Sequence, residues 1–143
     1  AGDLWFEADV DGLGTVYVIQ YHLDTSTTNG CPCLKRSQLP KINGNPVTGQ
    51  TAAVYQVEVQ GVQNTNVFSA YVNGATGSPI SLPLNFNSNG ATMATVDTVQ
   101  AVVTIRSTYM DPQTKEKPIT TLVTTVRLNN CSQAKAGLAM SCQ

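Results

Sequence analysis

Apolar and polar residues alternate along two long runs in the second half of the chain, residues 96–106 and 119–128. Both runs are rich in Val, Ile and Thr, whose β-branched side chains favour an extended, pleated backbone. The segment between them, residues 111–118, is polar and charged and carries two prolines, which is typical of an exposed hairpin tip. The pattern therefore predicts a long β-hairpin. Alternate apolar residues share one face of each strand, so we expect the hairpin to form the core of a sheet that the rest of the chain covers.

Shorter alternating runs predict the remaining strands, with residues 34–36 as a short edge strand. These strands are expected at residues 4–10, 15–23, 34–36, 51–60 and 67–72. Segments rich in Pro, Gly, Asn and Ser predict loops at 39–50 and 77–90. Helical signals are confined to about one turn at 91–94 and a short stretch at 134–136. The chain is thus predicted to be a single β-rich domain, residues 1–143, with about seven strands in one meander-like antiparallel sheet.

Composition narrows the class of protein. A chain of 143 residues can bury one ordinary core. Charged residues make up 12%, about half the usual share, and Ser, Thr, Asn, Gln and Gly replace them, as on many extracellular β-proteins. The net charge is −1 and the basic residues are scattered, so nothing favours nucleic acid as a partner. No run of about 18 apolar residues predicts a membrane span, and we expect any export signal to precede Ala1.

Four cysteines, an even number, indicate disulfides and an oxidising compartment; they are Cys31, Cys33, Cys131 and Cys142. A bond between Cys131 and Cys142 would close a local loop and contribute roughly 3 kcal/mol in the chain-entropy model. Because one residue separates Cys31 from Cys33, a bond between those two is expected to be strained. Cross-links from this pair to the C-terminal pair are the alternative. A zinc site with four thiolates is disfavoured, because the spacing differs from those of known zinc sites.

Candidates for catalysis are few. His22 is the only histidine and lies in a predicted strand, where we interpret it as a surface or half-buried residue. Carboxylates gather near the first and last hairpins, but no spacing among them favours a catalytic pair. They are Asp9, Asp11, Asp24, Asp97, Asp111 and Glu116. The sequence therefore predicts no enzyme and no cofactor.

Two further patterns have a functional and a structural interpretation. Asp9-Val10-Asp11-Gly12 resembles the start of a calcium loop, in which alternate carboxylates precede a glycine. A third ligand and a later bidentate Glu are missing, so a plain hairpin turn is the favoured interpretation and Asp9 and Asp11 are only calcium candidates. Several aromatic residues could line a sugar-binding face, although core packing is favoured because they lie in strands. These aromatics are Trp5, Tyr17, Tyr21, Tyr55, Tyr71 and Tyr109.

Motifs at both ends of the chain resemble one known family. Residues 6–14 combine an apolar strand with an Asp-x-Asp-Gly turn, residues 18–23 form a strand containing a Tyr, and Leu34-Lys35-Arg36 follows. Residues 99–106 and 121–130 resemble the last two strands of the same family. The family is that of the PilW-like minor pilins and J-class pseudopilins, and the resemblance covers residues 4–36 and 96–130.

The resemblance implies the head domain of a type IV pilus or type II secretion-like filament subunit that acts in assembly, priming or adhesion outside the cell or in the periplasm. The family fold is α+β, with a long N-terminal helix packed on an antiparallel sheet. This sequence lacks that helix, so we expect it to have been cut away or to be a separate chain, with other pilin subunits as partners. A C-terminal disulfide such as Cys131–Cys142 is common among pilins. The alternative function is a secreted β-sandwich that binds carbohydrate or acts as an adhesin, which predicts a solvent-facing cluster of aromatics.

Overall fold

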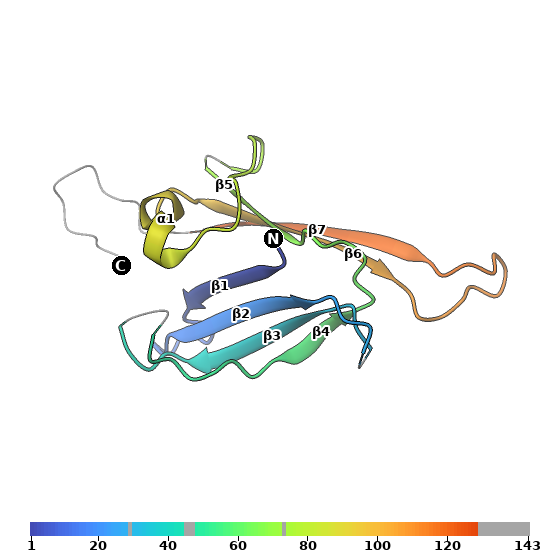
Figure 1. Cartoon of the computed structure of the whole chain (residues 1–143), viewed down its shortest axis with the longest axis horizontal. Coiled ribbons are helices and arrows are strands. Elements are labelled where there is room, and N and C mark those ends of the chain that lie inside the picture. Colours follow the sequence, from blue (N-terminus) through green and yellow to red (C-terminus); the bar gives the residue numbers. More distant parts are fainter. Residues whose placement is uncertain (29, 45–47, 73, 129–143) are drawn as a thin grey trace. The chain divides into compact units, whose positions relative to one another are not determined.

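The computed structural model describes residues 1–28, 30–44, 48–72 and 74–128, and its fold is mainly β (Figure 1). The elements, in chain order, are β1 (Asp3–Ala8), β2 (Tyr17–Asp24), β3 (Cys33–Pro40), β4 (Gln56–Gln60), β5 (Phe68–Tyr71), α1 (Phe86–Met93), β6 (Thr98–Arg106) and β7 (Ile119–Arg127). The strands form two antiparallel sheets, one with the order β1-β2-β3-β4 and one with the order β5-β6-β7. The expectation of a mainly β chain is confirmed, and the expectation of one sheet is wrong.

The first sheet is a meander in which every strand pairs with its neighbour in sequence. Tyr21 lies opposite Leu4 of β1 and opposite Arg36 of β3, so these residues point to the same face. β3 is a full inner strand of 8 residues that pairs with β2 and β4, and the expectation of a short edge strand at 34–36 is wrong. A register shift follows Leu34, where β3 meets β4.

The described residues form two compact units, one built from residues 1–68 with 102–122 and the other from residues 69–101 with 123–128. In the first unit the most deeply buried side chains come from β2, from β3, from the segment between β4 and β5, and from β6. They include Ile19, Leu23, Cys33, Leu34, Val62, Val67 and Val103. Tyr21 contributes to the same packing, with its ring centroid 5.9 Å from that of Phe68.

Residues 61–64 join this core to the second half of β6. Val62 forms an isolated antiparallel bridge with Ile105. The Asn64 side chain then substitutes for a strand backbone, because it donates to the carbonyl of Val102 at 2.8 Å and accepts from the amide of Thr104 at 2.8 Å. One asparagine thereby satisfies two backbone groups that a neighbouring strand would otherwise pair.

Hydrogen bonds of Tyr71 and Asp97 stabilise the second unit. Tyr71 is buried and its hydroxyl donates to Gln100 Oε1 at 3.2 Å. Asp97 donates its amide to the Tyr71 carbonyl and accepts from the amide of Gly74 through its carboxylate. The helix α1 has no acidic residue in its first turn, no basic residue in its last, and non-helical angles at Asn89. The helical turn considered at 91–94 overlaps only the end of α1. The first part of α1 lies in the segment predicted as loop, because it contains Asn and Gly and lacks an apolar period.

All nine residues of β7 are exposed. It is an edge strand with β6 as its neighbour, and its large apolar side chains keep between half and two thirds of their surface in solvent. These are Ile119, Leu122, Val123 and Val126. The predicted hairpin forms as expected, but the prediction that both of its strands lie in the core is wrong for β7. Among the described residues, no helix is long and apolar enough to cross a bilayer.

Candidate functional site

An aromatic and polar surface covers part of one face of the first sheet. The register places Trp5 opposite Gln20, and Asp3 opposite His22, on that face. Tyr55, just before β4, donates its hydroxyl to Gln20 Oε1 at 3.0 Å and lies with its ring 5.5 Å from the His22 ring. We call this set the Trp5–Tyr55 face; its members are Asp3, Trp5, Gln20, His22 and Tyr55.

Solvent reaches the rings of this face. Trp5 is 38% exposed and Tyr55 is 40% exposed, and the His22 Nδ1 atom lies 2.7 Å from Asp3 Oδ1. Partial burial raises the pKa of the Tyr55 hydroxyl, and the negative charge of Asp3 raises it further, so this hydroxyl remains a neutral hydrogen-bond donor. Exposed flat rings beside amide, hydroxyl and imidazole groups can stack on a ligand and hydrogen-bond its edge.

The other aromatic candidates serve different purposes. Tyr21 packs against Phe6 with ring centroids 6.5 Å apart, Tyr71 is buried, and Tyr109 is 83% exposed in the β6–β7 connection. Core packing was the favoured interpretation for all of them. It describes Tyr71 and does not describe Trp5 or Tyr55. Alternation places Trp5 on the face of β1 opposite to the apolar Leu4 and Phe6, which is a signal for the polar face. Tyr55 has no such signal, because the sequence pattern groups it with the apolar Val57 and Val59.

The calcium candidates Asp9 and Asp11 are occupied by hydrogen-bond donors of their own loop. Asp9 accepts from the amides of Gly12 at 2.8 Å and Gly14 at 2.9 Å, one on each oxygen. Asp11 accepts from the Leu13 amide at 3.0 Å and from the Tyr17 hydroxyl at 3.2 Å. The Gly14 amide is the main reason that the pKa of Asp9 lies below its usual value. The two carboxylates therefore organise the turn between β1 and β2, which is the favoured interpretation.

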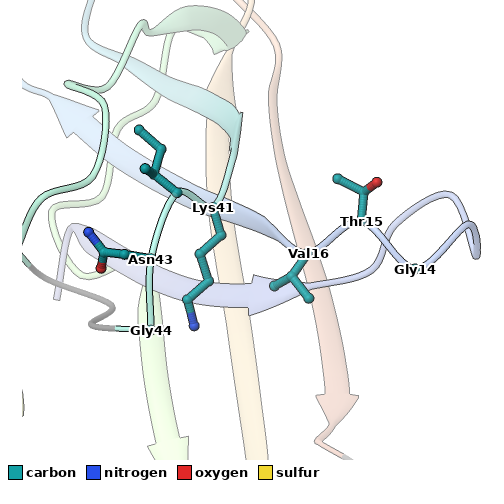
Figure 2. A pocket seen from close by; sticks show the side chains of 7 residues that line it. Gly14, Thr15, Val16, Lys41, Asn43 and Gly44 are labelled. Atoms are coloured by element: carbon teal, nitrogen blue, oxygen red, sulfur yellow. The ribbon is translucent and has the colours of Figure 1, made fainter.

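A shallow depression of about 500 Å³ lies where this loop meets the end of β3 (Figure 2). Its lining includes Thr15, Val16 and Lys41. The Lys41 Nζ atom lies 2.6 Å from Glu7 Oε2, so the cation of the depression is already compensated by a carboxylate. The arrangement stabilises the junction of β1, β2 and β3 and brings no reactive pair together.

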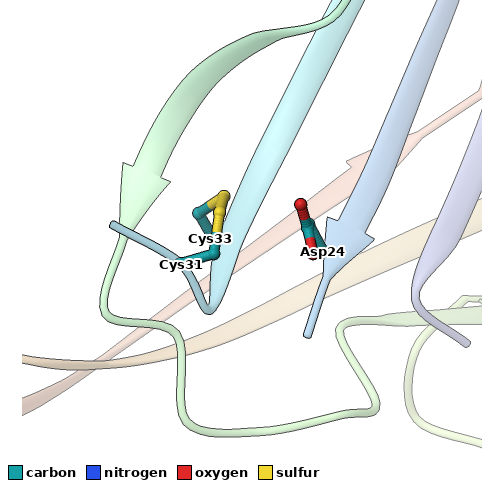
Figure 3. Close-up of side chains that lie close together, drawn as sticks. All are labelled: Asp24, Cys31 and Cys33. Carbon is teal, nitrogen blue, oxygen red and sulfur yellow. A yellow bond between two sulfur atoms is a disulfide. The ribbon is translucent and has the colours of Figure 1, made fainter. Parts of the chain in front are cut away.

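Cys31 and Cys33 form a disulfide with an S–S distance of 2.03 Å, next to Asp24 (Figure 3). A bond between these two residues is expected from the sequence to be strained, and the sequence leaves the pairing open. In this structure their sulfurs bond to each other, so neither is free for a zinc site or for a cross-link to the C-terminal pair. Cys131 and Cys142 lie outside the described residues. The sulfurs and a carboxylate oxygen of Asp24 lie within 4.8 Å of one another.

Asp24 is engaged by two donors. Its Oδ2 atom lies 2.6 Å from Lys35 Nζ, and its Oδ1 atom accepts from the Ser26 amide at 2.9 Å. The Lys35 hydrogen bond, followed by those of Ser26, holds the pKa of Asp24 well below its usual range. With both sulfurs in a disulfide and the carboxylate paired, the cluster ties the 24–33 loop to the start of β3.

The remaining acidic candidates also cap local structure. Asp97 accepts from Gly74, and Asp111 accepts from the amides of Gln113 and Thr114 in the hairpin tip. None of the carboxylates considered for catalysis is among the residues that line the depression beside Lys41. Compared with protein-family models, with curated proteins and with solved structures, the chain matches none of them.

Proposed function

We propose that this protein is a structural subunit of an extracellular or periplasmic filament, of the kind that the resemblance to minor pilins and pseudopilins implies. The observation that carries the proposal is the exposure of β7, an edge strand with large apolar side chains on both faces. Soluble proteins usually blunt such an edge with Lys, Pro, a bulge or a cover. Along β7 the only charge is at Arg127, its last residue.

Two further features support an assembly role. Within the described residues, the segments that carry the resemblance correspond to β1, β2 and the start of β3, and to β6 with β7. The side chains of the Asp-x-Asp-Gly turn and of His22 form hydrogen bonds with nearby protein groups, so these hydrogen-bonding groups are satisfied without a ligand. Covering β7 by a neighbouring subunit would bury its four large apolar side chains and pair its free edge.

Sedimentation velocity over the widest accessible concentration range tests the proposal. We expect the protein to associate as its concentration rises, and Val123→Lys to weaken this association because it places a charge on the exposed strand. Val57→Lys is the matched control, since Val57 is 45% exposed on β4, an edge strand of the other sheet. A protein that stays monomeric throughout, or equal effects of the two variants, would argue against assembly through β7.

A second candidate, a carbohydrate-binding or adhesin module, is favoured by the Trp5–Tyr55 face. Trp5 and Tyr55 expose rings on one face of a sheet beside Gln20 and His22, which is the arrangement that stacking on a sugar ring requires. A glycan array followed by calorimetry tests it. Binding that is lost in Trp5→Ala and Tyr55→Ala but kept in Tyr109→Ala, an exposed tyrosine elsewhere, would make this the leading function; an array without hits would remove it.

A further inference from the structure

A second depression, separate from the Trp5–Tyr55 face and from β7, lies within the first unit. It has a volume of about 400 Å³ and is formed by the loop before β3, the turn after β4 and the base of the β6–β7 connection. Its lining residues are Gly30, Cys31, Gly61, Gln63, Arg106, Ser107, Thr108 and Lys117. The lining includes two basic residues and no acidic one.

Within the described ranges, neither cation has an ion-pair partner. The ion pairs among the described residues use His22, Lys35, Arg36 and Lys41. Arg106 and Lys117 are exposed and take part in none of them. The acidic residues closest in sequence are Asp111 and Glu116, which do not line the depression, and Asp111 accepts hydrogen bonds from the hairpin tip. Two like charges are therefore gathered around one hollow, where they repel each other unless an anion neutralises them.

Neutral donors accompany the cations. Ser107 Oγ accepts from the Tyr109 amide at 3.0 Å, which leaves its own proton available for donation. Thr108 adds a second hydroxyl to the lining. An arginine, a lysine and hydroxyl donors around one depression match the oxygens of a tetrahedral dianion, which accepts from several directions at once.

The walls of the depression are fixed by the backbone. Gly61 accepts from the Arg106 amide at 2.9 Å, and Ser107 donates its amide to the Pro118 carbonyl at 2.8 Å. Gly61 has φ +73°, and a Cβ there would meet the carbonyl oxygen of Arg106. Cys31, another lining residue, is bonded to Cys33. A preformed hollow loses less ordering entropy when a ligand enters than a mobile one does.

We propose that this depression binds a phosphate or sulfate group, with Arg106 and Lys117 as the charged contacts and Ser107 and Thr108 as hydroxyl donors. The group can be a free anion or an ester carried by a larger molecule. The proposal does not depend on the proposed filament role, because neither β7 nor the Trp5–Tyr55 face contributes to the lining.

Titration with inorganic sulfate, inorganic phosphate and phosphoserine, followed by amide NMR shifts, tests this site. We expect saturable shifts centred on Gly30, Gly61, Ser107 and Thr108, and tighter binding of phosphoserine than of inorganic phosphate if an ester is the natural ligand. Sodium chloride at equal ionic strength should not reproduce them, because it screens charge without bridging the two cations. Shifts that chloride reproduces, or that centre elsewhere, would overturn the proposal.

Charge-removing variants provide the second arm. Arg106→Gln and Lys117→Gln should each weaken sulfate binding by about tenfold, and the double variant should abolish it. Lys115→Gln removes a charge from the same hairpin tip but not from the lining, so its affinity should stay within about twofold of the parent. Equal losses in Lys115→Gln and in the two lining variants would show general charge attraction instead of a site. If a variant does not fold, the amide shifts that sulfate and phosphate induce in the parent protein are sufficient to test the site.

Discussion

Asp24 is held between a strand and a loop by Lys35 and by the Ser26 amide. The folded chain keeps this carboxylate ionised to a lower pH than the unfolded chain does, because the Lys35 hydrogen bond lowers its pKa. Its stabilising contribution is therefore complete above the ordinary Asp pKa of about 3.9 and is lost as the pH falls below that value.

We expect Asp24→Asn to lower the midpoint of thermal unfolding at pH 7. The difference in midpoint between the variant and the parent protein should become smaller as the pH falls below about 4. Lys35→Gln should produce the same narrowing, because it removes the partner that lowers the pKa. Thermal melts followed by circular dichroism across this range measure both gaps, and the double variant reports the coupling between the two residues. A gap that stays constant with pH would contradict the assignment.

The partners of individual side chains could be predicted from the sequence only in part. The Asp9-x-Asp11-Gly12 pattern predicts a turn in which carboxylates bind either a cation or backbone amides, and spacing alone does not separate the two. The structure gives Asp9 two amide donors, from Gly12 and Gly14. Arg106 and Lys117 are a harder case, because eleven positions separate them and only the return of the hairpin brings them to one depression.

At the scale of elements, β6 and β7 carry nearly the same alternating pattern and differ in burial. Val103 of β6 is 9% exposed, whereas Val123 of β7 is 60% exposed. We expect Val103→Asp to unfold the domain, since burying an unpaired carboxylate costs about 4 kcal/mol or more against a total stability of about 5–15 kcal/mol. Val123→Asp should cost less than about 1 kcal/mol.

Urea denaturation of the two variants side by side measures this difference. The pair is matched, because each substitution replaces a valine of a β-strand by the same charged residue. A stable, folded Val103→Asp variant would contradict the placement of β6 in the core. A Val123→Asp variant as unstable as Val103→Asp would show that β7 is buried in the isolated protein.

Alternation identified the long strands because β-branched residues at every second position favour a strand over other secondary structures. It failed for β3, because the polar residues Lys35, Arg36 and Gln38 are not typical of an inner strand. Lys35 forms an ion pair with Asp24, and Arg36 faces Glu58 at 3.8 Å and the Tyr21 ring at 6.0 Å, so each charge is accommodated by a neighbour that sequence spacing does not reveal. The division of the strands into two sheets is equally hidden, because it depends on contacts between distant segments.

At the scale of the whole molecule, hydrogen bonding is unevenly distributed among the strands. β2 pairs on both sides, with β1 and β3, and contains the buried Ile19 and Leu23. β7 lies at a sheet edge with every residue exposed. Local opening therefore needs less free energy at β7 than at β2, where amides become accessible mainly through global unfolding.

Native-state hydrogen exchange measured by NMR should show this gradient, with β2 and β3 amides exchanging last and β7 amides much earlier. The same experiment connects stability to the proposed assembly. If neighbouring subunits cover β7, its protection should rise with protein concentration, while that of the edge strand β4 stays constant. Slow exchange of β7 in dilute monomer would mean that the strand needs no cover, and protection rising equally at β4 would move the contact surface away from β7. Either result would remove the structural reason for placing the subunit contact on this strand.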